Sequence, residues 1–220
     1  MSDSALHKKD LQEGLRVLSE GLLRSVSRAA LPGNVLEIRH AAAPMLNPEY
    51  LRNAGYDLDA FFSLNRGSEP YSGQPVVCDT ARLPFQDSVF SMVVLHHVVS
   101  LGMESELEEA VRVLAGDGVL IILGFNRNGW RFRFQGHLSR LPGIAPLKVK
   151  ARLDQLEMAM QGFAGAGLFG MQRPVFMRSG IAGLGSPIAD VVLLQARHIS
   201  GPEMTPLRFK KLGAGIVQSA

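Results

Sequence analysis

The 220-residue chain is predicted to have an α/β fold, in which helices cover both faces of a parallel sheet. Short apolar segments of strand length alternate along the chain with segments whose apolar residues recur at helical spacing. The strand-sized segments are continuously apolar rather than alternating, which is typical of strands buried on both faces. Because 46% of the residues are hydrophobic, we expect one domain over residues 1–220 with a substantial core.

The elements are expected in the following order. An amphipathic helix is predicted within residues 1–32, where Leu11, Leu15 and Leu18 belong to one stripe at helical spacing and Pro32 ends the pattern. Apolar runs predict strands at residues 35–38, 61–64, 75–78, 89–99, 119–125, 175–177 and 191–196. The remaining patterns predict helices at 103–114 and 150–163, irregular or weakly helical chain at 44–53, a turn at 116–118 and an irregular tail at 201–220.

Composition excludes several classes of protein. No segment approaches the ~18 consecutive apolar residues of a transmembrane helix, so no membrane span is expected. The start of the chain lacks the apolar core of a signal peptide, which predicts a cytoplasmic protein. Cys78 is the single cysteine, which excludes a disulfide framework and a cysteine-rich zinc site. The histidines and acids also lack the spacing of metal ligands, so no metal is predicted.

One run of the sequence carries a detailed pattern. Residues 76–94 read VVCDTARLPFQDSVFSMVV, and His96-His97, EEAVRVL at 108–114 and GVLII at 118–122 continue the pattern in order. This run resembles the central segment of class I S-adenosylmethionine (SAM)-dependent methyltransferases. The similarity is closest to the methyltransferase type 11 group, whose pattern is D-x-x-x-L-P-F-x-D-x-x-F-D.

The resemblance covers residues 33–126 well and the rest of the chain thinly. The segment LGFN at 123–126 with Trp130, together with residues 193–197 and 205–208, also resembles a divergent proteobacterial subgroup.

The resemblance implies a Rossmann-like class I methyltransferase fold with a mainly parallel seven-stranded sheet, helices on both faces and a final antiparallel strand. It divides the single domain into an N-terminal helix (1–32), a cofactor-side core (33–126), a basic insert (127–150), a C-terminal helix with strands (151–200) and a tail (201–220). It also implies that the cofactor is SAM.

The resemblance places the nucleoside part of the cofactor beside Asp79, Thr80 and Ala81, which follow the third expected strand. In the family, the acid at this position contacts the adenine amino group, and a carboxylate is a good acceptor for an amine. Asp79 alternatively caps a turn through its own backbone. Asn65 ends the second expected strand, where family members usually have an acid that holds the ribose hydroxyls.

The first loop departs from the family pattern. The family has V-L-E-I-G-x-G-x-G, whereas residues 35–43 read VLEIRHAAA, so Glu37 is retained and Arg39 replaces the first glycine. Glycine lets the backbone approach a ligand closely. Arg39 is expected to pair either with the methionine carboxylate of SAM or with an acid on a neighbouring loop. Two functions therefore stay open: a SAM-dependent methyltransferase, or a catalytically inactive relative that serves as a binding or regulatory module.

The methyl acceptor is expected near the ends of the fourth and fifth strands. His96 and His97 are the candidate catalytic residues, because histidine is a suitable base at neutral pH. Asn126, Trp130 and Arg131 are the candidate substrate residues. The literal G-x-G-x-x-G at 165–170 is interpreted as a flexible connection, because a helix-like stretch precedes it rather than a strand.

Charge is distributed unevenly between these parts. Residues 1–125 carry a net −6 and residues 126–220 a net +9, which together give the formal +3. The insert at 127–150 is basic, contains no Asp or Glu and has interleaved aromatic residues. It is expected to be either a lid for a small or anionic acceptor or a solvated loop, and a peripheral membrane contact stays open. Nucleic acid is not expected, because no nucleic-acid module accompanies it.

Overall fold

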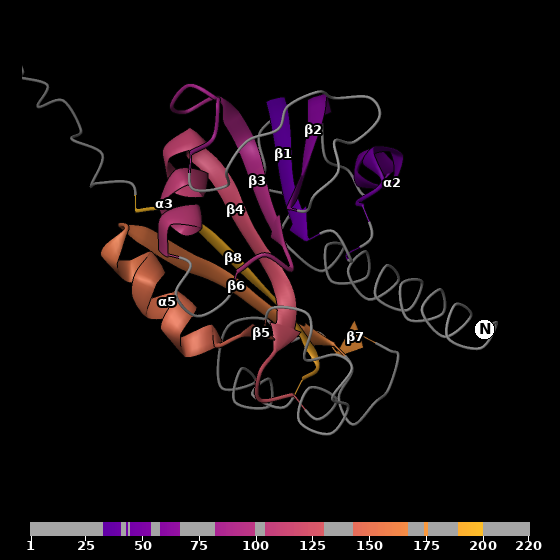
Figure 1. Ribbon diagram of the computed structural model, residues 1–220, viewed down its shortest axis with the longest axis vertical. Coiled ribbons are helices and arrows are strands. Elements are labelled where there is room, and N and C mark those ends of the chain that lie inside the picture. Colours follow the sequence, from indigo (N-terminus) through magenta and orange to yellow (C-terminus); the bar gives the residue numbers. More distant parts are fainter. Residues whose placement is uncertain are drawn as a thin grey trace, which may run out of the picture.

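The strands join into a single mixed sheet in the order β2-β1-β3-β4-β8-β6-β7, with β5 paired to β4 (Figure 1). The computed structural model describes residues 33–40, 43, 45–53, 58–66, 82–99, 104–129, 143–166, 174–175 and 189–199. The strands in these ranges are β1 (Gly33–His40), β2 (Leu58–Arg66), β3 (Phe90–His96), β4 (Leu114–Asn126), β5 (Gly143–Ile144), β6 (Met158–Ala166), β7 (Pro174–Val175) and β8 (Val191–His198). The helices are α2 (Pro48–Asn53), α3 (Glu104–Val113) and α5 (Pro146–Gln155).

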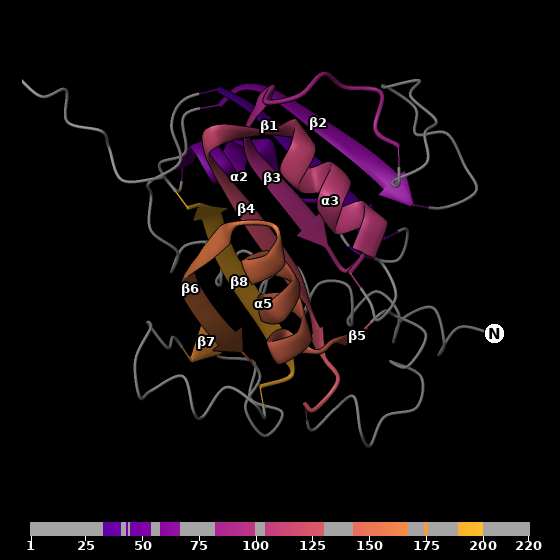
Figure 2. The same ribbon diagram turned by 90° about the vertical axis from the view of Figure 1, so that its left-hand side faces the viewer.

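Strand directions confirm the α/β class. Strands β2, β1, β3 and β4 are mutually parallel, β5 adds to β4 in parallel, and β8 runs antiparallel to both β4 and β6. The sheet is therefore mainly parallel with a final antiparallel strand that inserts between β4 and β6. Helices α3 and α5 lie side by side on one face, and α2 lies on the other (Figures 1 and 2). None of the helices in the described ranges is long and apolar enough to cross a membrane.

The main core lies between the sheet and the helices α3 and α5. Alternate strand residues such as Ile38, Leu95 and Ile122 point into it and are fully buried. Helix α3 adds Leu107 and Ala110, which lie on one face because they are three residues apart. This pattern of strand residues buried along whole segments is what the continuous apolar runs predicted.

The predicted helix at 150–163 is wrong in its second half. Helix α5 ends at Gln155, and the chain continues as strand β6, which pairs with β8 from Met158 opposite His198 onward. Glu157 has a φ of 57°, a left-handed conformation that stops the helix between the two elements. The G-x-G-x-x-G motif at 165–170 was expected to follow a helix-like stretch. Instead, its first two residues, Gly165 and Ala166, belong to β6, so a strand leads into the motif.

Smaller differences concern the ends of elements. The predicted turn at 116–118 is a bulge inside β4. Four residues lie between Leu114 and Val119, while one lies between their β3 partners Phe90 and Met92. Strand β7 covers Pro174–Val175 where 175–177 was expected. Strand β5 and the start of α5 fall within 127–150, which the sequence assigned to an insert. The predictions for 1–32, 75–78 and 201–220 lie outside the described residues.

Candidate functional site

Strands β1 and β3 are parallel neighbours at the centre of the sheet, and the chain leaves them toward opposite sides. From β1 the chain proceeds to β2 at one edge, and from β3 to β4 on the other side. In α/β sheets, ligands bind beyond the carboxyl ends of the strands at such a switch point. The register places Arg39 opposite His96, and His96 opposite Leu123 of β4. Polar side chains predicted from sequence therefore meet at this edge.

Glu37 is fully buried and is the centre of a polar network across three strands. Its Oε2 accepts a hydrogen bond from Ser63 Oγ of β2 at 2.9 Å, and its Oε1 lies 3.0 Å from His96 Nδ1 of β3. The same Oε1 accepts the backbone N–H of Leu46 at 3.1 Å. A buried carboxylate requires such partners, and together they fix Glu37 and His96 relative to each other. Ser63 and Leu46 were not predicted from sequence.

Arg39 is buried and holds the loop that follows β1. Its Nη1 donates to the carbonyl oxygen of Ala43 at 2.8 Å, and the Ala43 N–H donates to the carbonyl of His40 at 2.9 Å. Strand β1 continues to His40, beyond the position of the family's first glycine. A guanidinium has five N–H donors, and Arg39 uses one of them to hold Ala43 in place.

His97 follows directly on His96 but has different surroundings. Its φ is 56°, and its N–H donates to the carbonyl of Leu123 at 2.7 Å. Its ring is fully buried beside Phe125, with ring centroids 4.9 Å apart. Burial lowers the pKa of His97 well below its ordinary value, and the nearby His96 and His40 lower it further. His97 is therefore a neutral imidazole at neutral pH.

Asn126 ends β4 and organises the turn that follows it. Its Oδ1 accepts the N–H of Asn128 at 3.0 Å, and its own N–H donates to the carbonyl of Asp190 at 2.9 Å. The side chain is fully buried. Asn126 therefore fixes the chain at the carboxyl edge next to His97, and a contact with substrate stays a prediction.

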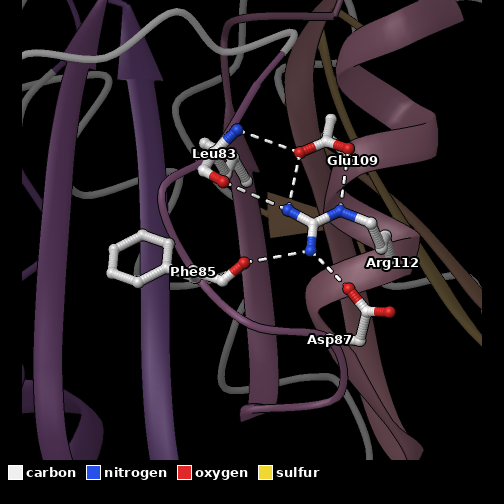
Figure 3. A network of polar contacts seen from close by, with 5 residues as sticks. All are labelled: Leu83, Phe85, Asp87, Glu109 and Arg112. Carbon is white, nitrogen blue, oxygen red and sulfur yellow. Dashed lines mark hydrogen bonds and ion pairs between the residues drawn. The ribbon is translucent and has the colours of Figure 1, made fainter.

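A second polar network anchors the loop before β3, within residues 82–89 (Figure 3). The Arg112 guanidinium donates to the carbonyls of Leu83 and Phe85, to Asp87 and, through two bonds of 2.8 Å, to Glu109. Glu109 also accepts the N–H of Leu83 at 2.9 Å. We call Arg112, Glu109 and the loop groups that they hold the arginine clamp.

The clamp fixes the charge states of its two main members. The hydrogen bond from Arg112 lowers the pKa of Glu109, and the bond to Glu109 raises the pKa of Arg112. Phe85 packs edge-on against Phe90 with ring centroids 4.9 Å apart, so this loop packs on the sheet. The clamp was not predicted from the sequence. The spacing of three between Glu109 and Arg112 on a helix was the available signal.

Several predicted site residues lie outside the described part of the chain, namely Asp79, Thr80, Ala81, Trp130 and Arg131. Asn65 is placed by its backbone only, opposite Arg39 in the pairing of β2 with β1. Within the described residues, no three His, Cys, Asp or Glu side chains form a group that could hold a metal ion.

The basic stretch after β4 is partly neutralised by ion pairs. Lys150 Nζ lies 2.6 Å from Asp154 on the same helix, and Arg152 pairs with Glu108 of α3. Arg127 is exposed directly after Asn126, at the carboxyl edge. Of these cations, Arg127 is therefore the one placed next to the candidate site.

No protein-family model matches the sequence, and no curated protein is similar to it. Solved structures do share the fold. A chain in the complex of the Haloferax volcanii Trm112 methyltransferase activator with a methyltransferase is 14% identical, with 87% of this chain and 93% of that chain covered and a TM-score of 0.57. A SAM-dependent methyltransferase of Thermotoga maritima is 15% identical over 88% of this chain and 94% of its own, with a TM-score of 0.52.

A SAM-dependent methyltransferase of Archaeoglobus fulgidus is 12% identical over 88% of this chain and 99% of its own, also with a TM-score of 0.52. At identities this low the similarity establishes the fold and not the activity. The mixed sheet with its antiparallel β8 between β4 and β6 is the class I methyltransferase fold.

Proposed function

We propose that this protein is a SAM-dependent methyltransferase that acts on a small or anionic acceptor. The observation that carries the proposal is the polar edge at the switch point between β1 and β3. There the Glu37–His96 pair, Arg39 and His97 lie at the carboxyl ends of neighbouring strands. This is where sheets of this class bind their ligands.

The residue types at this edge fit the parts of SAM. Arg39 provides a cation for the methionine carboxylate. Asn65 is the candidate for a ribose hydroxyl, and Asp79 with Thr80 and Ala81 for the adenine, as the family resemblance implies. When bound, SAM supplies a methyl group that is already activated on a sulfonium. The chain has to hold an acceptor in line with that methyl group and exclude water.

The network around Glu37 supports this assignment indirectly. Glu37 holds the N–H of Leu46, and Arg39 holds the carbonyl of Ala43, so both ends of the loop after β1 are fixed to the strand. A preorganised loop of this kind loses little conformational freedom when a ligand binds. Asn126, Trp130 and Arg131 are proposed for the acceptor side, and the exposed Arg127 suits an anionic group there.

One observation favours the second candidate, a catalytically inactive binding or regulatory module. The carboxylate of Glu37 is satisfied by Ser63, His96 and Leu46, and Arg39 already bonds to Ala43, so the protein itself uses the polar groups of β1. A module of this kind retains the fold and transfers no methyl group.

Calorimetric titration with SAM and with S-adenosylhomocysteine tests the proposal. The methyltransferase binds both ligands, and Asp79→Ala weakens both affinities because the adenine loses its acceptor. Absence of heat at millimolar ligand rejects SAM-dependent activity and leaves the binding module. If the wild type binds and Asp79→Ala has unchanged affinity, the adenine assignment is wrong while the activity stands.

A further inference from the structure

His96 and His97 are adjacent in sequence but are used differently by the fold. The Nδ1 of His96 faces the carboxylate of Glu37 at 3.0 Å, in the network that joins β1, β2 and β3. His97 is fully buried, and neither of its ring nitrogens has a hydrogen-bond partner. A buried polar atom without a partner is unfavourable, so the two ring nitrogens of His97 require an explanation.

The backbone of His97 is also in an uncommon conformation. Its φ of 56° lies in the left-handed region, and the 2.7 Å bond from its N–H to Leu123 holds it there. Strained residues of this kind are concentrated at ligand sites, where the strain directs a side chain. Here it turns the ring of His97 toward the end of β4, beside Phe125 and 3.9 Å from the position of a Cβ on Gly124.

The surroundings of the ring determine its charge. Strand β4 presents Gly124 and Phe125 beside it, and neither carries a charge. The titratable groups that act on it are His96 on β3 and His40 at the end of β1, and both oppose a positive charge on His97. The ring is therefore neutral at neutral pH, with one ring nitrogen able to accept a hydrogen bond.

We propose that His97, and not His96, contacts the methyl acceptor and that the acceptor is a hydroxyl or a protonated amine, which becomes the nucleophile when His97 takes its proton. This inference rests on the proposed methyltransferase function. The acceptor oxygen or nitrogen forms a bond to the methyl carbon. The sulfur–methyl bond of SAM breaks, and its electron pair stays on sulfur to give the neutral thioether. The proton of the acceptor moves to a ring nitrogen of His97 and is later released to water.

The first test observes the ring of His97 directly. Protein with ¹⁵N-labelled histidine is saturated with S-adenosylhomocysteine and titrated with 4-hydroxybenzoate, a small anionic phenol. The signals of the His97 nitrogens are identified by their loss in His97→Gln. We expect the phenol to shift these signals, while the His96 signals, held by Glu37, change little. This measurement is made on the wild-type protein, so it does not depend on the folding of any variant.

The second test compares three small anionic acceptors, namely 4-hydroxybenzoate, 4-(aminomethyl)benzoate, whose amine is protonated at neutral pH, and 4-mercaptobenzoate. We expect His97→Gln to lower kcat/KM for the hydroxyl and amino probes by about 10²–10⁴-fold, the usual contribution of a positioned base. The thiol ionises near neutral pH and needs no base, so any transfer to it changes by less than about tenfold.

Failure of the wild type to bind S-adenosylhomocysteine rejects the proposed function itself. If the wild type binds it but 4-hydroxybenzoate leaves the His97 signals unchanged, the inference is wrong while the proposed function stands. Transfer to the thiol probe alone, or equal loss of all three activities in His97→Gln, also contradicts the role of His97 as a proton acceptor.

Discussion

Gly129 packs closely against the backbone of neighbouring residues, so we expect any side chain at this position to destabilise the fold. A Cβ at this position would lie 2.8 Å from the Ala189 carbonyl oxygen and 2.9 Å from the Asp190 Cα. We expect Gly129→Ala to lower the free energy of unfolding by about 1–3 kcal/mol, because backbone atoms have to shift. Gly116→Ala is the matched control, since nothing lies within 4 Å of its Cβ. Urea unfolding measures both, and equal stabilities of the two variants would contradict this packing.

The neutral state of His97 predicts how stability depends on pH. Because its folded-state pKa lies well below about 6.5, the unfolded chain binds a proton in mild acid that the folded chain does not. The contribution of neutral His97 to the free energy of unfolding is complete above about pH 6.5. It is lost as the pH falls toward the folded-state pKa of His97, at up to about 1.4 kcal/mol per pH unit.

His97→Phe removes this titration, so its stability should fall less steeply than that of the wild type between about pH 6.5 and pH 5. Urea unfolding at a series of pH values measures the difference. Parallel curves for the two proteins would show that His97 titrates normally in the folded state.

At the scale of residues, the sequence predicted which side chains lie at the edge but not how they are used. Glu37 and the two histidines were expected there. Ser63 and Leu46 were not, because they meet Glu37 through the register of β2 and through a loop, which non-local pairing determines. The two histidines were equivalent in sequence, and the fold separates them through the Glu37 contact of His96 and the left-handed backbone of His97.

At the scale of elements, the arginine clamp ties the loop before β3 to α3. We expect Arg112→Ala to lower the free energy of unfolding by about 1–2 kcal/mol, because several charge-assisted hydrogen bonds are lost from a side chain that is partly screened by water. Arg112→Lys should be intermediate, since an ammonium keeps the charge but cannot make the paired bonds to Glu109.

Lys150→Ala is a suitable comparison for the clamp. Lys150 forms a single ion pair with Asp154 on the surface of α5, and both side chains are about half exposed. Loss of this ion pair in Lys150→Ala should lower the free energy of unfolding by less than about 0.5 kcal/mol. Thermal or urea unfolding measures both variants, and a loss in Arg112→Ala no larger than in Lys150→Ala would show that the clamp adds no stability.

Strongly apolar elements were predicted well, and weakly patterned ones were not. β1, β3, the second half of β4, and β8 follow the continuous apolar runs. Residues 158–166 are rich in Ala, Gly and Met, which have little preference for strand, and β6 forms there because the edge of β8 offers a partner. The bulge in β4 looked like a turn because it contains Gly116, Asp117 and Gly118.

At the scale of the whole molecule, the order of the elements was predictable because an alternation of strands and helices permits few parallel topologies. The antiparallel direction of β8 was expected only from the family resemblance, since apolar pattern does not determine strand direction. Its place between β4 and β6 was not predicted. The same sheet order brings Arg39, His96 and Asn126 to one edge from positions far apart in the sequence. The site is therefore a property of the topology.

The central claim, that this edge is a SAM site, is tested most directly by a crystal structure of the protein with S-adenosylhomocysteine. The account predicts the ligand across the carboxyl ends of β1 and β3, with its amino-acid part toward Arg39, its adenine toward Asp79 and its sulfur on the side of His97. A ligand bound elsewhere, or crystals soaked in millimolar ligand that show none at this edge, would contradict it.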